Sequence, residues 1–225
     1  LETFEISAEM TDASSLLSLL RNVGTLKEIT VEEGNTNYQA KFGALYDMEW
    51  NLLFVPKAMT TFTIPVEVTQ LGGTSAMSGL FDGSAITKVT YEEGDGEAFT
   101  VEGYNSSSVF YGANNLTTVE LPARTVSIGN YAFYSCSSLI SVNIPSGVTS
   151  IGAQAFYYSN NIVSITIPNT VTTVGTDAFR AWSSTQTINL GFTEAEATTI
   201  MANWAWDWNW NSNANIVYAD TTVTE

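Results

Sequence analysis

Apolar and polar residues repeat along this chain with a period of 23 residues. Three consecutive units begin at Leu116, Leu139 and Ile162 and carry proline, glycine and phenylalanine at matching positions. Within a unit, Val142 and Ile144 alternate with polar neighbours, and this period of two predicts a β-strand. A repeat of this length predicts a solenoid, in which each coil buries its apolar side only against neighbouring coils.

The rest of each unit predicts how the chain returns to the next strand. Pro145 ends the strand because proline has no N–H to donate. Val148 and Ile151 predict a second short extended segment, and Gly152 predicts a tight turn that needs a permissive backbone. We expect a short helical turn over residues 153–159.

Three phenylalanines keep the same 23-residue spacing: Phe133, Phe156 and Phe179. Strands of successive coils lie ~4.8 Å apart, so equivalent side chains stack on one another. The sequence therefore predicts a continuous aromatic column through the core.

The repeat continues upstream with less regular spacing. Strands are expected in residues 26–31, 61–73 and 88–91, and a last repeat strand in 187–190. Two alternating segments on either side of 47–51 predict a β-hairpin inserted into one coil.

Both ends of the chain differ from the repeats, as the ends of an open solenoid must. Residues 14–23 predict an N-terminal helix, and residues 216–219 a final strand. Thr193 followed by Glu196 forms a capping-box pattern, which predicts a helix from Glu194 to about Met201. We expect one domain of 225 residues: N-terminal cap (1–25), irregular repeats with the hairpin insertion (26–112), regular 23-residue repeats (113–190) and C-terminal cap (191–225).

The net charge of −16 limits the possible partners. Nucleic-acid binding is not expected, because Lys and Arg contacts to phosphates supply most of that affinity. The same charge opposes adsorption to anionic lipid. No apolar run approaches the ~18 residues of a membrane-spanning helix, so we expect no membrane insertion.

Candidate catalytic chemistry is limited by the absence of histidine, which excludes Ser-His-Asp and Cys-His mechanisms and His-based zinc sites. Cys136 occupies a core position of the repeat and is expected to be a small buried hydrophobe. A pair of catalytic carboxylates remains open on composition alone. The acidic turns at 32–33 and 92–97 could bind calcium, although solvated turns are favoured because neither has the spaced calcium-loop pattern. We expect no enzyme, metal or cofactor.

The string Pro-x-x-Val-x-x-Ile-Gly-x-x-Ala-Phe-x-x-Cys, read over Leu116–Ser183, resembles the BspA-like (Treponema-type) leucine-rich repeats. Glu33–Pro56 and Asn189–Asp220 are similar to a hairpin insertion and a closing segment recurrent in that family. The resemblance implies a β-rich α/β solenoid, a right-handed superhelix with short parallel strands. It also implies an extracellular or cell-surface protein of host-associated bacteria, without shared catalytic residues.

This chain departs from the family pattern at a few positions. Thr125 replaces the valine of the other units, and the cysteine position of Cys136 holds Ser159 and Trp182 in the next two units. These local changes leave the predicted fold intact.

Two groups of residues are candidates for partner binding. The first consists of outward strand positions in two polar columns: Thr118, Ser141, Ser164 and Thr187, and Glu120, Asn143, Thr166 and Asn189. Such columns could hold a partner or simply fill a β-surface, and the sequence leaves both open. Tyrosines lie further round the coil: Tyr131, Tyr134, Tyr157 and Tyr158.

The second group is an alternating run of tryptophans: Trp204, Trp206, Trp208 and Trp210. A strand would place all four rings on one side, where they could stack on sugars or anchor a protein. Closure of the last coil is the favoured interpretation, with one or two rings exposed.

The sequence thus predicts a monomeric, non-enzymatic surface or secreted adhesion module. Its expected partner is a host or neighbouring-cell surface or matrix protein, bound through the sheet. A carbohydrate-binding module that uses the tryptophans, or a passive spacer in a larger surface protein, are the alternatives.

Overall fold

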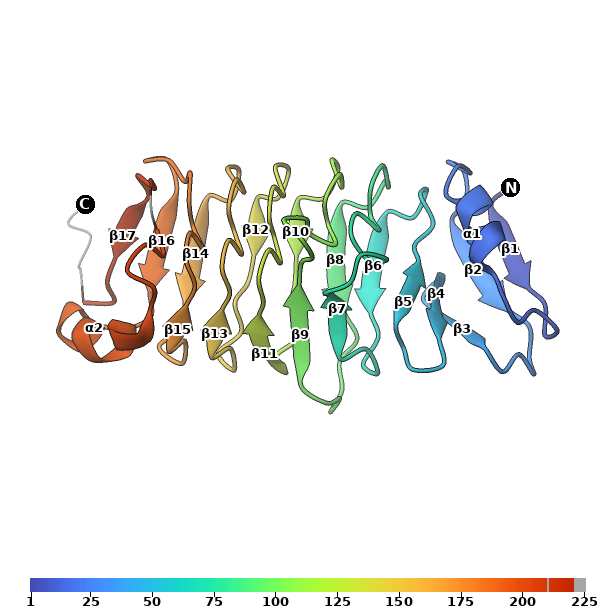
Figure 1. The fold of residues 1–225 in the computed structure, drawn as a ribbon, viewed down its shortest axis with the longest axis horizontal. Coiled ribbons are helices and arrows are strands. Elements are labelled where there is room, and N and C mark those ends of the chain that lie inside the picture. Colours follow the sequence, from blue (N-terminus) through green and yellow to red (C-terminus); the bar gives the residue numbers. More distant parts are fainter. Residues whose placement is uncertain (210, 221–225) are drawn as a thin grey trace.

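The computed structural model describes residues 1–209 and 211–220. The predicted strands stack coil upon coil along the long axis of the molecule (Figure 1). Along one side, four parallel strands form a sheet: β6 (Thr61–Ile64), β8 (Lys88–Tyr91), β10 (Thr118–Val119) and β12 (Ser141–Val142). Three more parallel strands follow: β14 (Ser164–Ile167), β16 (Thr187–Leu190) and β17 (Asn215–Val217). The outward side of these strands is called the sheet face below.

The register of the strands follows the repeat. Thr118 pairs with Ser141, and Ser164 pairs with Thr187, so residues one period apart are direct neighbours. The predicted solenoid is confirmed, with about eight turns.

The second extended segment of each repeat forms a second parallel sheet on another side of the coil. Its strands are β7 (Gln70–Gly72), β9 (Phe99–Glu102), β11 (Thr125–Ile128), β13 (Ser150–Ile151) and β15 (Thr173–Val174). Ser127 pairs with Ser150 and Ser150 with Thr173, again one period apart.

The aromatic column is confirmed. The Phe133 and Phe156 rings stack with centroids 5.2 Å apart and planes 7° apart, and Phe156 and Phe179 stack at 5.2 Å and 9°. All three side chains are fully buried. The column also extends toward the N-terminus, where Phe110 stacks on Phe133 at 5.6 Å and Phe81 packs against Phe110 at 5.2 Å.

The predicted helical turn is wrong. Residues 131–135, 153–158 and 176–181, called the turn strip below, form successive turns without a helix. Their backbone bonds to the next coil instead: Phe133 N donates to Ala155 O at 2.7 Å and Phe156 N to Ala178 O at 2.8 Å. A helix would direct these N–H groups into its own carbonyls, whereas the turn strip forms a third ladder between coils.

Residues with left-handed backbone conformation point the N–H groups of the turn strip toward the next coil. Gln154 and Tyr158 have φ of 54° and 58°. The equivalent positions in the neighbouring coils are also left-handed: Tyr131, Ser135, Asp177 and Ala181. Such conformations cost free energy for residues other than glycine, and they are held here by the bonds between coils.

The repeat glycines serve a different purpose from the predicted one. A methyl group added at Gly152 would collide with backbone atoms of Gly129 and Asn130, and one at Gly175 would collide with Ala153. Glycine is needed because adjacent coils approach closely at this corner, and none of the three glycines has positive φ.

The N-terminal third contains the inserted hairpin. Strands β3 (Tyr38–Lys41), β4 (Ala44–Asp47) and β5 (Leu52–Phe54) form an antiparallel sheet, so the expected hairpin around 47–51 is β4–β5 and β3 extends it. Beyond it, β1 (Thr3–Ile6) pairs in parallel with β2 (Glu28–Val31). The helix α1 (Ser14–Leu20) connects them and contributes Leu20 to a separate small core. Strand β1 was not predicted.

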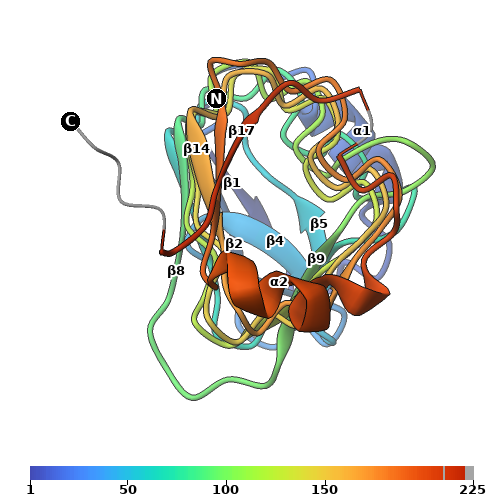
Figure 2. The ribbon, with the colours of Figure 1, turned by 90° about the vertical axis from the view of Figure 1, so that its left-hand side faces the viewer.

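The C-terminal end is closed by α2 (Glu194–Ile200), a 3-10 turn (Met201–Asn203) and β17. The capping box is confirmed: Thr193 accepts from Glu196 N, and the Glu196 carboxylate accepts from Thr193 N at 2.8 Å. Figure 2 looks onto this end, where α2 crosses the edge of the last coil. Within the described residues, neither helix combines the length and hydrophobicity of a transmembrane span.

The departures from the repeat pattern are accommodated in the core. Thr125 is buried and its hydroxyl donates to Pro122 O at 2.6 Å. Ser159 and Trp182 are buried and donate to the carbonyls of Phe133 and Phe156. Because each buried polar group has a partner, these substitutions carry no desolvation penalty from an unpaired group.

We expect Phe156→Ala to lower the free energy of unfolding by ~3–5 kcal/mol, because it leaves a cavity in the middle of the aromatic column. Urea denaturation measures this loss. Val163→Ala removes a side chain that is 61% exposed and is the matched control; its effect should stay within ~0.5 kcal/mol. Equal stability of the wild type and Phe156→Ala would contradict the packed column.

Candidate binding surfaces

The two predicted polar columns lie on the sheet face, and none of their side chains is buried: Thr118, Ser141, Ser164, Thr187, Glu120, Asn143, Thr166 and Asn189. Where the ladders join column members, the partners are one period apart: Thr118 with Ser141, Ser164 with Thr187, and Thr166 with Asn189. Whether they bind a partner stays a prediction.

Two members of the columns already have structural contacts. Glu120 pairs with Lys88 Nζ at 2.6 Å, which lowers the pKa of the Glu120 carboxyl, and it accepts from Thr90 Oγ1 at 3.1 Å. The Asn143 amide accepts from Leu121 N at 2.7 Å and donates to Leu121 O at 3.2 Å. The Asn143 side chain thus continues the ladder beyond the two residues of β12. The column members without such a contact are five hydroxyl side chains and the Asn189 amide.

The tryptophans do not share one face. Trp204 and Trp208 are each 8% exposed, whereas Trp206 is 82% exposed, and Trp210 lies outside the described residues. The segment forms turns rather than a strand. The three described tryptophan rings therefore do not lie on one side, as they would in a strand. A sugar platform built on this run is reduced to Trp206.

Trp208 and its neighbours close the last coil. The Trp208 ring packs edge-on against Phe179 at 5.8 Å and against Trp204 at 5.1 Å. The backbone of this segment also closes the last coil: Asp207 O accepts from Asp177 N at 3.1 Å, and Trp208 O accepts from Phe179 N at 3.0 Å. These carbonyls occupy the place that a further coil of the turn strip would take.

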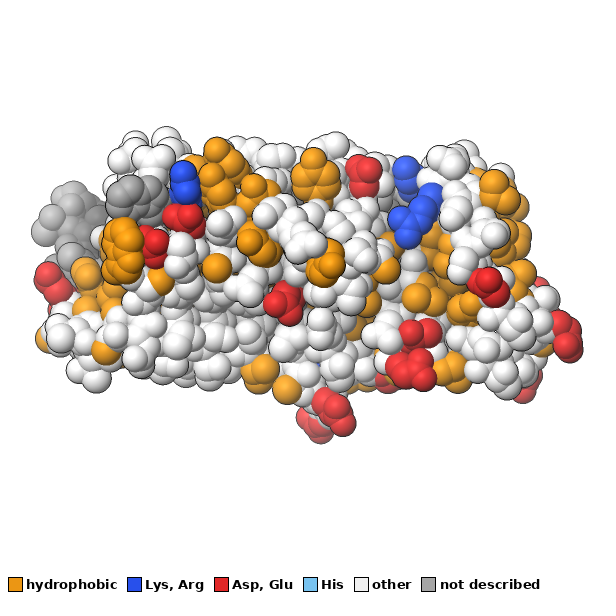
Figure 3. Space-filling view, in the orientation of Figure 1, with side chains coloured by type: hydrophobic (Ala, Val, Ile, Leu, Met, Phe, Trp, Pro, Cys, Tyr) orange, Lys and Arg blue, Asp and Glu red, His pale blue; other side chains and the backbone are white. Residues whose placement is uncertain are grey.

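An aromatic ridge crosses the turn strip of the C-terminal coils. Tyr157 stacks on Tyr158 at 4.2 Å and 17°, and the Arg180 guanidinium lies over the Tyr157 ring at 5.2 Å. Tyr134 packs edge-on against Tyr157 at 5.4 Å. We call Tyr134, Tyr157, Tyr158 and Arg180 the aromatic ridge. Figure 3 shows hydrophobic side chains gathered beside a basic one over these coils.

The ridge is held in place by several contacts. Arg180 pairs with Asp177, which is 8% exposed, at 3.1 Å. The neighbouring Tyr158 side chain raises the pKa of the Tyr157 phenol. Tyr158 remains 46% exposed at the outer end of the stack. The sequence identifies these tyrosines but does not predict their contact with Arg180. The left-handed turns determine where the side chains point, and these turns were not predicted.

Catalytic and metal-binding groups are sparse. Cys136 is 6% exposed, and burial raises the pKa of its thiol to about 12. In the described part of the chain, His, Cys, Asp and Glu side chains form no group of three or more that could hold a metal ion. Two acidic turn residues support the backbone instead: Glu32 accepts from Ala8 N at 2.9 Å and Glu92 from Val66 N at 3.0 Å.

We expect Trp208→Ala to destabilise the protein by ~3–5 kcal/mol, because the ring is packed against the end of the phenylalanine column. Trp206→Ala is the matched control and should change stability by about 0.5 kcal/mol or less, as exposed substitutions do. Thermal and urea unfolding measure both. Equal losses in the two variants would contradict closure by Trp208.

We expect the Cys136 thiol of the native protein to resist Ellman's reagent at pH 8. The thiolate is the reactive form, and a buried thiol with a raised pKa stays protonated. In denaturing urea the thiol should react at once with one equivalent of reagent. Rapid reaction of the native protein would show that Cys136 is accessible.

Comparison with known proteins gives the family of the repeats. The sequence profile of the BspA type leucine rich repeat region matches residues 105–203. A comparison with curated proteins found no match.

Two solved structures share the fold. The pneumococcal vaccine antigen PcpA is 19% identical, with a TM-score of 0.63 over 98% of this chain. A leucine rich cell surface protein of Faecalibacterium prausnitzii A2-165 is also 19% identical, with a TM-score of 0.53 over 98% of this chain. This chain spans 56% and 48% of their respective lengths, about half of each. The repeat pattern, the stacked coils and the profile match lead to one conclusion: the repeats of this chain belong to the BspA-type leucine-rich repeat family.

Proposed function

We propose that this chain is a monomeric, non-enzymatic binding module at the surface of a bacterial cell and that it recognises a protein partner. The surface location is supported by the two solved relatives, one described as a vaccine antigen and the other as a cell surface protein. The protein partner is supported by the aromatic ridge.

The composition of the ridge favours a protein. Tyr, Trp and Arg are the residues most enriched among the energetic hot spots of protein interfaces. Here Tyr158 and Arg180 each lie against the Tyr157 ring, and the Asp177 carboxylate fixes the guanidinium. A partner would order few side chains on contact, which lowers the entropic cost of association.

The sheet face is the second surface in this proposal. It presents four uncharged, unburied side chains of the polar columns: Ser141, Ser164, Thr166 and Thr187. Such a surface suits many weak polar contacts around a stronger anchor. We propose that the ridge provides the anchor and that the sheet face can add area to the same interface.

A glycan is the second candidate ligand, because Trp206 is 82% exposed and an open indole can stack on a sugar ring. The ridge itself favours a glycan less. The Tyr157 ring already contacts the Tyr158 ring at 4.2 Å and the Arg180 guanidinium at 5.2 Å, so less of it is open to a sugar.

The test measures binding of the purified chain to immobilised host matrix proteins and to a glycan array. For a matrix protein that binds, Tyr158→Ala and Arg180→Gln should each weaken affinity at least tenfold, a loss of about 1.4 kcal/mol. Thr166→Arg tests the sheet face at an exposed position. Asn143 is unsuitable, because its amide holds the Leu121 backbone.

The outcomes separate the alternatives. Binding to glycans alone, abolished by Trp206→Ala, would replace the protein partner with a carbohydrate. If only Thr166→Arg lost protein binding, the sheet face and not the aromatic ridge would provide the main contact with the partner. A chain that binds neither panel would be a spacer, and the proposed function would be rejected.

A further inference from the structure

A groove of about 640 Å³ lies between the inserted hairpin and the two coils that follow it. Three segments line this groove: the turn between β4 and β5, the turn between β6 and β7, and the loop between β8 and β9. Figure 2 shows that the last of these, residues 92–98, projects beyond the outline of the other coils. All three segments precede the regular repeats, so the groove occurs once in the solenoid.

The groove offers an accessible aromatic surface. Trp50 and Val66 line it, and both are half-buried, so part of each side chain is open to solvent. The Trp50 ring is held from behind: it packs against the buried Tyr46 ring at 5.4 Å, and Lys41 Nζ lies 5.6 Å from its centroid. Lys41 is not part of the groove lining. Trp50 therefore already makes one cation–π contact and still has surface in the groove for a second partner.

The groove is also acidic. Four of its lining residues carry a carboxylate: Glu49, Glu67, Asp95 and Glu97. Glu67 pairs with Lys41 at 2.9 Å. In the part of the chain that the structure describes, the other three carboxylates have neither an ion pair nor a side-chain hydrogen bond. The lining thus combines an open indole with negative charge that no side chain neutralises.

The walls of the groove are connected to one another. Lys41 also pairs with Glu92 at 2.6 Å, and the Glu92 carboxylate accepts from Val66 N at 3.0 Å. Arg124 donates to Glu97 O at 2.8 Å. These contacts join the hairpin, the turn after β6 and the projecting loop. A ligand would therefore order little additional backbone, which lowers the entropic cost of binding.

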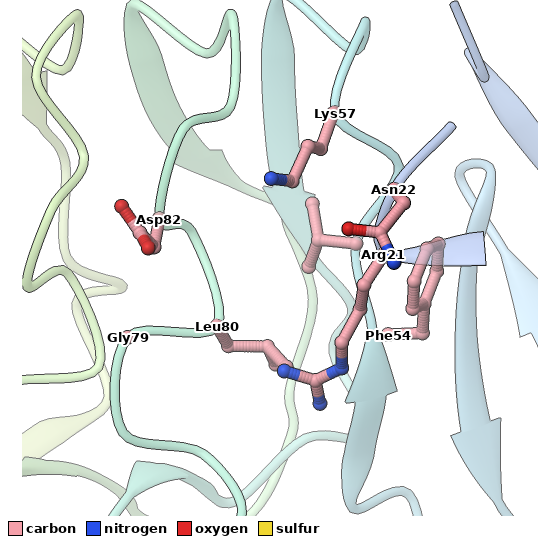
Figure 4. Close-up of a pocket in the computed structure, with 8 residues that line it drawn as sticks. Arg21, Asn22, Phe54, Lys57, Gly79, Leu80 and Asp82 are labelled. Atoms are coloured by element: carbon pink, nitrogen blue, oxygen red, sulfur yellow. The ribbon is translucent and has the colours of Figure 1, made fainter. Parts of the chain in front are cut away.

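The other basic side chains of the chain lie elsewhere. Lys27, Lys88 and Arg180 pair with acidic residues outside the groove lining. Arg21 and Lys57 line a smaller cavity beside the N-terminal cap, where their charged ends point to different places (Figure 4). A cation that neutralises the groove would thus have to come from another molecule.

An arginine side chain suits both features of the groove. Its guanidinium is planar and can stack on an indole, while its N–H groups donate to carboxylates in pairs. A lysine ammonium is compact and more strongly hydrated, so it stacks less well. A metal ion would leave the indole unused, and the described acidic side chains form no group of three or more that could hold one.

We propose that this groove binds an arginine side chain of a protein partner, with the guanidinium on the Trp50 ring and its N–H groups donating to Asp95 and Glu97. This site extends the proposed protein recognition to a second surface. It does not use the aromatic ridge and is tested with a peptide alone, so either proposal can fail without the other.

The test is an NMR titration of the full chain with the peptide acetyl-Gly-Arg-Gly-Arg-Gly-amide. The signals followed are the amides of Gly94 and Gly96 and the indole N–H of Trp50, all from lining residues. The matched control peptide carries citrulline, which keeps the shape of arginine without its charge. We expect saturable shifts with the arginine peptide, at least tenfold weaker binding of the citrulline peptide and at least threefold weaker binding of the lysine peptide.

The variants separate a built site from general attraction to an acidic protein. Asp95→Asn and Glu97→Gln should each weaken binding of the arginine peptide at least threefold, and Trp50→Leu at least fivefold. Glu33→Gln is the matched control variant, because it removes one exposed carboxylate outside the groove lining. It should bind like the wild type. Melting temperatures show whether each variant stays folded, and the two variants of exposed carboxylates keep the test valid if Trp50→Leu unfolds.

Four outcomes would each overturn the proposal. Equal binding of the arginine and citrulline peptides would remove the role of charge, and equal binding of the lysine peptide would remove the stacked guanidinium. Equal weakening by Glu33→Gln would show attraction to the net charge alone. Unchanged binding in both Asp95→Asn and Glu97→Gln, or in a folded Trp50→Leu, would place the peptide outside this groove.

Discussion

The structure depends on contact between equivalent residues of successive coils. One coil alone exposes its phenylalanine, its strand N–H groups and its glycine corner, and the next coil covers all of them at once. Backbone ladders link the coils at the two parallel sheets and along the turn strip. The glycine corner allows the close approach that these ladders need. A change in the length of one repeat would shift every one of these contacts, which explains why the 23-residue period is kept so strictly where the repeats are regular.

The same dependence explains the two ends. The last coil has no successor, so Asp207 and Trp208 supply carbonyls to the turn strip and the Trp208 ring covers Phe179. At the other end, β1 pairs with β2, and α1 contributes to a second small core. A run of tryptophans that looks like a ligand platform is thus mostly explained by closure, and Trp206 is the described member that closure leaves in solvent.

The sequence predicts the features that depend on the repeat period, which are the repeat strands and the phenylalanine column, and a local motif, the capping box at Thr193. It fails where long-range contacts decide the local conformation. Left-handed backbone at Tyr131, Gln154 and Asp177 has no sequence signal, because glycine or asparagine is the usual residue there. The aromatic ridge depends on tertiary placement, which the spacing of its residues does not encode.

Function in such a solenoid is best sought where the repeat is broken. Positions that recur from coil to coil are fixed by stacking, as the buried phenylalanines illustrate. The aromatic ridge uses a residue that does not recur: Arg180 stands at the repeat position that Tyr134 and Tyr157 hold in the two preceding coils. A guanidinium that replaces a tyrosine in one coil is not needed for stacking, since the tyrosine of the other coils serves there. Its cation–π contact with Tyr157 instead gives the ridge a charge that the other coils lack, and this difference is what a partner can recognise.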